Sequence, residues 1–155
     1  MSEVKHEVLL QAKGIYKNFE TSKKDQAVHA LTNVDLTLYR GETLALVGES
    51  GCGKSTLGRT LIRMLPATRG SVTFEGQNIN DTKAHTTPAM KDKEFAPLRR
   101  RMQMVFQDPY ASLDPRMKVR DIIAEPLETY HVCKTKAETT HRVLELMQAV
   151  GVSAE

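Results

Sequence analysis

The chain has 155 residues, 40% of them hydrophobic, which is enough to bury one core and form a single domain. Its 22 Lys and Arg residues against 19 Asp and Glu residues give a net charge of +3, too small to favour nucleic acid or an anionic membrane surface as a partner. No apolar run approaches the ~18 residues that span a bilayer, and residues 1–5 lack the basic and apolar regions of a signal peptide. Two cysteines far apart favour a reducing, cytosolic setting.

Hydrophobic patterning predicts several strands in the first half of the chain. Residues 8–15 and 31–38 read as strands, the second with strict alternation of apolar and polar residues. The polar stretch 20–26 between them predicts a surface connection. A continuous apolar run at 43–47 predicts a buried strand, and an alternating segment follows at 71–74.

The second half of the chain predicts mostly helices. Residues 80–95 are polar without periodicity and predict an exposed insertion, after which 101–106 reads as a buried core strand. Residues 118–130 predict a helix interrupted by Pro126. The last helix is expected to start at Thr135, with Glu138 completing a capping box, and to stop at Gly151.

A glycine-rich loop stands between the predicted strand at 43–47 and a predicted helix at 55–65. Residues 48–56 read Gly-Glu-Ser-Gly-Cys-Gly-Lys-Ser-Thr, a full match to the phosphate-loop pattern G-x-x-x-x-G-K-[ST]. The glycines let backbone N–H groups turn inward, and the helix N-terminus adds unpaired donors and a positive dipole end. Lys54 is expected to reach the β- and γ-phosphates, and the Ser55 hydroxyl to ligate Mg²⁺. The motif alone is shared by kinases, GTPases, helicases and transport ATPases.

Residues beyond the loop resemble the ATP-binding subunits of ABC transporters. The Ser-Gly-Cys-Gly-Lys-Ser-Thr form of the loop is similar to theirs, and Met104 to Pro109 resembles their Q-loop. The resemblance implies that Gln107 contacts Mg²⁺ and the attacking water, and that an aromatic residue at the end of the first strand stacks on adenine. Phe19 is favoured for that role, with Tyr16 as the competitor. The resemblance thus implies ATP and Mg²⁺ as cofactors, with Lys54 and Gln107 as catalytic residues and Ser55 and Gln107 as metal ligands. The expected nucleotide-binding residues are Phe19, Gly48, Glu49, Ser50, Gly51, Cys52, Gly53, Lys54, Ser55, Thr56 and Gln107.

Within that family, the sequence is similar to the oligopeptide, dipeptide and nickel importers. The run 106–116 and the segments 122–127 and 129–131 resemble the F-type subunit of oligopeptide permeases. This implies an ATPase that couples ATP binding and hydrolysis to peptide import, with transmembrane permease subunits, a second ATP-binding subunit and peptide delivered by a binding protein as partners. The resemblance further implies a cytoplasmic location, peripheral on the inner face of the membrane. Nickel and glutathione importers remain alternatives.

Three family elements are missing from the sequence. No Leu-Ser-Gly-Gly-Gln-type signature loop, apolar strand ending in Asp-Glu, or switch histidine follows Gln107. The predicted elements and the resemblance together imply an α/β fold: a phosphate-loop core of ABC type with an attached antiparallel β subdomain and the start of a helical subdomain, truncated because these three family elements are missing. Residues 1–107 would form the nucleotide-binding core, and 108–155 the Q-loop continuation and the helices.

Three interpretations of this sequence remain. The first is the N-terminal part of an ATPase subunit that binds ATP with little or no turnover. The second is a non-hydrolysing nucleotide-binding or interaction fragment. The third is a self-sufficient phosphate-loop kinase or GTPase, which would need an acidic residue on a second core strand. It is disfavoured because the only candidate, Asp108, precedes Pro109 and is expected in a loop, and because no Asn-Lys-x-Asp motif is present.

Overall fold

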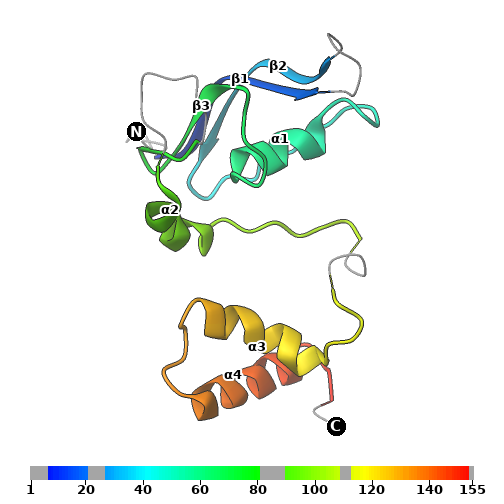
Figure 1. Cartoon of the computed structure of the whole chain (residues 1–155), viewed down its shortest axis with the longest axis vertical. Coiled ribbons are helices and arrows are strands. Elements are labelled where there is room, and N and C mark those ends of the chain that lie inside the picture. Colours follow the sequence, from blue (N-terminus) through cyan, green and yellow to red (C-terminus); the bar gives the residue numbers. More distant parts are fainter. Residues whose placement is uncertain (1–6, 21–26, 81–89, 109–112, 154–155) are drawn as a thin grey trace, which may run out of the picture. The chain divides into compact units, whose positions relative to one another are not determined.

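The computed structural model describes residues 7–20, 27–80, 90–108 and 113–153. These residues form two compact units, Met1–Gln103 and Met104–Glu155, which we describe one at a time (Figure 1). The predicted division into residues 1–107 and 108–155 stays a prediction for the complete subunit. None of the helices in the described parts of the chain is both long enough and apolar enough to cross a membrane.

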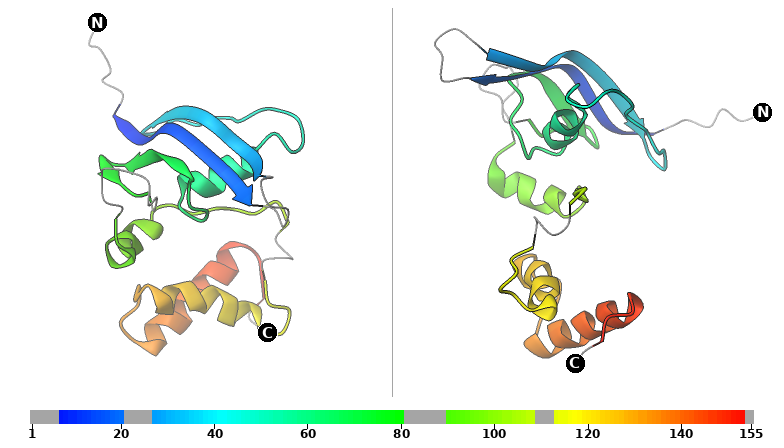
Figure 2. Two further views of the ribbon diagram at one scale, coloured as in Figure 1. Left: turned by 45° about the horizontal axis from the view of Figure 1, so that its top comes forward. Right: turned by 90° about the vertical axis from the view of Figure 1, so that its right-hand side faces the viewer.

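The first unit is built on an antiparallel sheet with the strand order β2-β1-β3-β4. Figure 2 shows its two long strands, β1 in dark blue and β2 in lighter blue, side by side. Its strands are β1 (Val8–Glu20), β2 (Ala27–Tyr39), β3 (Arg69–Phe74) and the short β4 (Gln77–Asn78). The three strands expected at 8–15, 31–38 and 71–74 are confirmed, and β1 and β2 are longer than expected. The predicted connection at 20–26 lies largely outside the described residues.

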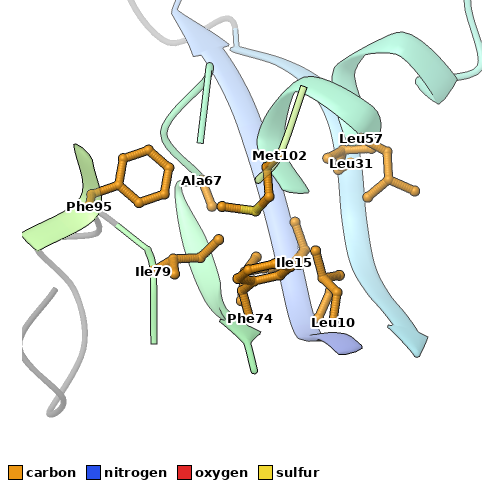
Figure 3. Close-up of a cluster of buried hydrophobic side chains, with 11 residues drawn as sticks. Leu10, Ile15, Leu31, Leu57, Ala67, Phe74, Ile79, Phe95 and Met102 are labelled. Carbon is orange, nitrogen blue, oxygen red and sulfur yellow. The ribbon is translucent and has the colours of Figure 1, made fainter. Parts of the chain in front are cut away.

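One face of this sheet carries the core of the unit (Figure 3). The helix α1 (Lys54–Leu61) contributes Leu57, and the helix α2 (Asp92–Arg99) contributes Phe95, which is 1% exposed. On the sheet side, the period of two along each strand directs alternate apolar residues to this face. The buried apolar residues of the cluster are Leu10, Ala12, Ile15, Leu31, Leu57, Ala67, Val72, Phe74, Ile79, Phe95 and Met102.

Helix α1 is shorter than the predicted 55–65. It ends at Leu61, and Arg63 adopts a left-handed backbone conformation with φ of 59°. The amides of Met64 and Leu65 then both bond to the carbonyl of Arg59. The chain therefore turns out of the helix before it reaches Pro66.

Two predicted strands are wrong. Residues 43–47 form no strand, and the whole stretch 41–50 is exposed, with Val47 at 94%. Residues 101–106 form no strand either, and Val105 is 97% exposed, although Met102 is buried. A strand requires a neighbour to accept and donate its backbone hydrogen bonds, and no described strand pairs with either segment.

The predicted exposed insertion at 80–95 is partly wrong. Residues 81–89 lie outside the described parts of the chain, but α2 begins at Asp92 and buries Phe95. The amide of Lys91 donates to the Glu94 carboxylate at 3.0 Å, which caps the helix locally. The ring of Phe95 is flanked by the guanidinium groups of Arg63 and Arg99, at 4.6 and 5.3 Å from its centroid.

An ion-pair cluster fastens the turn between β3 and β4. Glu75 occupies that turn with φ of 48°, and its carboxylate accepts from Arg40 Nη2 at 2.8 Å and from both terminal nitrogens of Arg101. Arg40 also pairs with Glu7 at 3.0 Å. Hydrogen bonds from Arg101 and then from Arg40 lower the pKa of Glu75 to about 2.

The second unit is a helical hairpin of α3 (Val119–Thr129) and α4 (Lys136–Ala149). The predicted helix at 118–130 is confirmed, but the predicted interruption is wrong, because α3 runs unbroken from Val119 to Thr129 with Pro126 inside it. The predicted start of α4 is confirmed, because the Thr135 hydroxyl accepts from the Glu138 amide at 3.2 Å. The Glu138 carboxylate accepts from the Lys134 amide at 2.8 Å, one residue before the Thr135 amide that the predicted capping box requires. Gly151, with φ of 72°, follows the end of the helix. Val143 and Met147 of α4 are buried, and a groove of about 760 Å³ runs along both helices.

Candidate functional site

The predicted phosphate loop is an exposed turn that leads directly into α1. Gly51 and Gly53 have φ of 82° and 96°, a backbone conformation that favours glycine. The Cys52 amide donates to the Glu49 carbonyl at 3.3 Å and closes the turn. All residues from Gly48 to Cys52 are exposed, so a ligand can reach the backbone of the loop.

Helix α1 begins with an open N-terminus. Gly53 is its N-cap and has no side chain to accept a hydrogen bond, and the first turn contains no acidic residue. The first bond within the helix runs from the Leu57 amide to the Gly53 carbonyl at 2.8 Å. The amides of Lys54, Ser55 and Thr56 therefore have no acceptor within the helix, and they lie at its positive dipole end. This arrangement suits an anion with several oxygens.

The ammonium group of Lys54 turns back into the loop. Its Nζ donates to the carbonyl oxygens of Gly48 at 2.7 Å and Glu49 at 2.6 Å, and it lies 3.5 Å from Cys52 Sγ. The positive charge thus sits among the loop residues, partly exposed, and not in open solvent. A phosphate oxygen is a stronger acceptor for this ammonium than a neutral carbonyl, because it carries charge.

The loop also packs tightly on the sheet. A methyl group on Gly53 would lie 2.5 Å from the carbonyl oxygen of Ala30 and 3.2 Å from Leu31 Cδ2, both on β2. Gly48 is similarly close to Cys52, whose Sγ would lie 2.7 Å from such a methyl group. The contact between Gly53 and β2 fixes where α1 starts, and the sequence pattern alone gave no sign of it.

The residues of the loop fit Mg²⁺ as a companion of a bound polyphosphate. The Ser55 side chain is exposed at the helix N-terminus and offers a hydroxyl oxygen. Within the described ranges, no group of three or more His, Cys, Asp or Glu side chains could hold a metal ion by itself. Mg²⁺ commonly takes few protein ligands together with phosphate oxygens and water, so one hydroxyl at this position is consistent with its chemistry.

The two aromatic candidates for adenine stacking differ in exposure. Phe19 is 38% exposed near the end of β1, opposite Val28 of β2, and Lys17 Nζ lies 5.0 Å from the centre of its ring. Tyr16 is half-buried and pairs with Arg69 of β3. Both belong to the same unit as the phosphate loop.

Gln107 is exposed and belongs to the second unit, in a segment without secondary structure. The expectation that it ends a core strand is wrong for this structure, because 101–106 is not paired. The segment 106–116, which resembles oligopeptide permease subunits, is described only in part, because residues 109–112 lie outside the described residues. Further along that run, Asp114 accepts from Arg116 at 2.9 and 3.0 Å, which lowers the pKa of the Asp114 carboxyl.

The loop motif and the open helix N-terminus are features of phosphate-loop proteins. A model of the ABC transporter family matches residues 31–155, and the chain belongs to this family. The predicted membership is therefore confirmed, and a kinase or GTPase of another phosphate-loop family is excluded.

Several curated proteins are similar to the chain. It is 47% identical over 149 residues to the oligopeptide transport ATP-binding protein OppF of Bacillus subtilis, with 96% of this chain and 46% of the relative covered. It is 42% identical to the dipeptide transport ATP-binding protein DppF of Lactococcus lactis, over 94% of this chain and 44% of the relative. It is 46% identical to the glutathione import ATP-binding protein GsiA of Pectobacterium atrosepticum, over 83% of this chain and 19% of the relative. The chain spans less than half the length of these curated relatives.

A solved structure supports the fold. The dimeric, post-hydrolysis ATP-binding cassette MJ0796 bound to ADP and Pi matches with a TM-score of 0.73 at 25% identity, over 94% of this chain and 59% of that one. The expected fold class is therefore confirmed: an ABC-type cassette with an antiparallel sheet and helices, of which this chain covers only a part.

Proposed function

We propose that the chain carries the phosphate-binding part of an ATP-binding subunit that couples ATP binding and hydrolysis to peptide import. The observation that carries this proposal is the open N-terminus of α1 behind a glycine turn, with Lys54 held in the loop, in a member of the ABC transporter family. The names of the oligopeptide and dipeptide relatives support peptides as the cargo.

In this proposal, residues 48–56 bind the polyphosphate of ATP. The backbone N–H groups of the loop and of Lys54, Ser55 and Thr56 donate to phosphate oxygens. Lys54 exchanges the carbonyl oxygens of Gly48 and Glu49 for the β- and γ-phosphates, and charge–charge attraction favours that exchange. The catalytic role expected of Lys54 is to stabilise charge on the transferred phosphoryl group.

Ser55 and Gln107 are the proposed protein ligands of Mg²⁺. The ion, when bound, supplies neutralisation of phosphate charge. Both side chains are exposed in their own units and can therefore contact a ligand. Gln107 would further hold the attacking water.

Phe19 is the proposed platform for adenine. Phe19 is 38% exposed, whereas Tyr16 is half-buried, and stacking on a base requires an accessible aromatic face, which in Phe19 is the face that Lys17 does not cover. Phe19 therefore stays ahead of Tyr16 as the stacking residue.

The complete protein is proposed to act as a peripheral subunit on the cytoplasmic face of the membrane. Its partners would be transmembrane permease subunits and a second ATP-binding subunit, with peptide supplied by a binding protein and no role for nucleic acid. The dimeric MJ0796 cassette supports the pairing of two ATP-binding subunits. The similarity to a glutathione import protein keeps a glutathione importer as the second candidate.

An assay of phosphate release from MgATP distinguishes a chain that hydrolyses ATP from one that only binds it. The 155 residues hold the phosphate loop and the Q-loop but no signature loop, Asp-Glu strand or switch histidine, so we expect ATP binding with little or no turnover. Phosphate release from MgATP by the wild-type chain should equal that of Lys54→Ala. Release clearly above that control would contradict the expectation, and tighter binding of GTP than of ATP would contradict the adenine site.

A further inference from the structure

We propose that Leu31 is a positioning residue for phosphate binding: its side chain and the Ala30 carbonyl form a backstop on β2 that holds Gly53 at the start of α1. This inference rests on the proposed phosphate site and adds to it a residue outside the glycine motif. It concerns only the first unit, in which all of these residues lie.

The contact geometry is the first argument. Gly53 approaches β2 so closely that a methyl group there would lie 2.5 Å from the Ala30 oxygen and 3.2 Å from Leu31 Cδ2. The first distance is too short for any real carbon atom, and the second is tighter than most van der Waals contacts. The end of the loop is therefore held at β2 by the backstop, which two consecutive residues of the strand form.

The burial of Leu31 is the second argument. Leu31 is 5% exposed, although its neighbour Thr32 and the three residues 27–29 of the same strand are exposed. It shares the core cluster with Leu57, the first buried residue of α1 (Figure 3). One side chain thus belongs to the core that holds the helix in place and also limits the space at Gly53 in the turn before the helix.

The consequence for binding follows from where Gly53 stands. The amides that follow it, on Lys54, Ser55 and Thr56, have directions set by the first turn of α1. If the Leu31 side chain is shortened, the Ala30 carbonyl stays in place but one side of the backstop is lost; Gly53 can then tilt about the remaining contact, and those amides turn away from a bound phosphate. Hydrogen bonds weaken steeply when they lose alignment, and the loss of binding free energy is larger when the acceptor is a charged phosphate oxygen.

The test compares two core leucines of the same unit. Leu31→Val removes the Cδ2 atom that faces Gly53 and introduces a β-branched side chain, which is suited to a strand. Leu10→Val is the matched control, because Leu10 is 6% exposed and belongs to the same cluster, yet it pairs with Leu38, seven residues further along β2. That separation corresponds to roughly 20 Å along the strand.

Binding of Mg-tripolyphosphate and MgATP is measured by titration calorimetry on the full chain, below the melting range of each variant. Tripolyphosphate reports on the phosphate loop without the base. We expect Leu31→Val to weaken both ligands by about tenfold, the equivalent of one charge-assisted hydrogen bond, and Leu10→Val to change neither by more than about threefold. A structural role alone would lower the melting temperature of both variants and leave the two affinities unchanged.

The outcomes separate the two proposals. If the wild-type chain binds both ligands and Leu31→Val binds them equally well, the positioning role is wrong and the phosphate site stands. The same conclusion follows if Leu10→Val weakens binding as much as Leu31→Val. If the wild-type chain binds neither ligand, the phosphate site itself is wrong, and the positioning role falls with it.

Discussion

Two glycines of the loop share a left-handed backbone but differ in the space around them. Gly51 has φ of 82° and nothing within 4 Å of an added methyl group, whereas a methyl group on Gly53, with φ of 96°, meets the Ala30 carbonyl at 2.5 Å. Alanine at either position is strained by about 1–2 kcal/mol, because L-residues disfavour this conformation. Gly53→Ala also displaces the loop or β2, at an overpacking cost of about 1–3 kcal/mol.

We therefore expect Gly51→Ala to lower the free energy of unfolding by about 1–2 kcal/mol and Gly53→Ala by about 2–5 kcal/mol. Urea denaturation followed by far-ultraviolet circular dichroism measures both values on the same chain. Gly51→Ala is the matched control for backbone strain, so the difference between the variants isolates the contact with β2. Equal losses in the two variants would refute the reasoning, since they would show that Gly53 has room.

Three further predictions concern the helix cap, the ion-pair cluster and the loop thiol. Thr135→Ala should lower the stability of the α3–α4 hairpin by about 1 kcal/mol, because the Glu138 amide loses its cap acceptor; urea denaturation checks this, and an unchanged midpoint would contradict it. The pKa of Glu75 is lowered from 4.5 to about 2, so its ion pairs stabilise the fold fully above pH 4.5 and this stabilisation is lost as the pH falls towards 2. Glu75→Gln should therefore flatten the pH dependence of the melting temperature over that range. A profile unchanged from that of the wild-type chain would contradict this prediction. A thiol reagent should modify the exposed Cys52 before the half-buried Cys133, and MgATP should slow the first reaction; equal rates without an ATP effect would contradict the loop assignment.

The elements that the sequence predicted well are those with local signals. The alternation in β2 and the capping residues of α4 depend on neighbours in the chain, and both elements formed where expected. The phosphate loop was equally local, since its glycines and Lys54 carry the pattern within nine residues. The structure added the packing of Gly53 on β2, which joins residues far apart in sequence.

The wrong predictions concern structure that depends on distant partners. The apolar runs at 43–47 and 101–106 resemble buried strands, but a strand forms only where another strand satisfies its backbone, and no described strand pairs with them. The sequence did not predict helix α2, because the helix contains Pro97 and its single buried residue, Phe95, gives no helical periodicity. Its order comes from the Glu94 cap and from the packing of two arginines on the Phe95 ring, neither of which shows as a hydrophobic pattern.

The most direct test of the central claim is a thermal-shift titration of the wild-type chain and Lys54→Ala with MgATP, MgADP and MgGTP. A ligand at about 100 times its Kd stabilises the folded state by about 2.7 kcal/mol, which corresponds to a rise in Tm of about 5–10 °C for a chain of this size. We predict such a rise with MgATP and MgADP for the wild-type chain, and none for Lys54→Ala. A cooperative transition that no nucleotide shifts, or a shift that Lys54→Ala retains, would contradict the assignment of residues 48–56 as the nucleotide site.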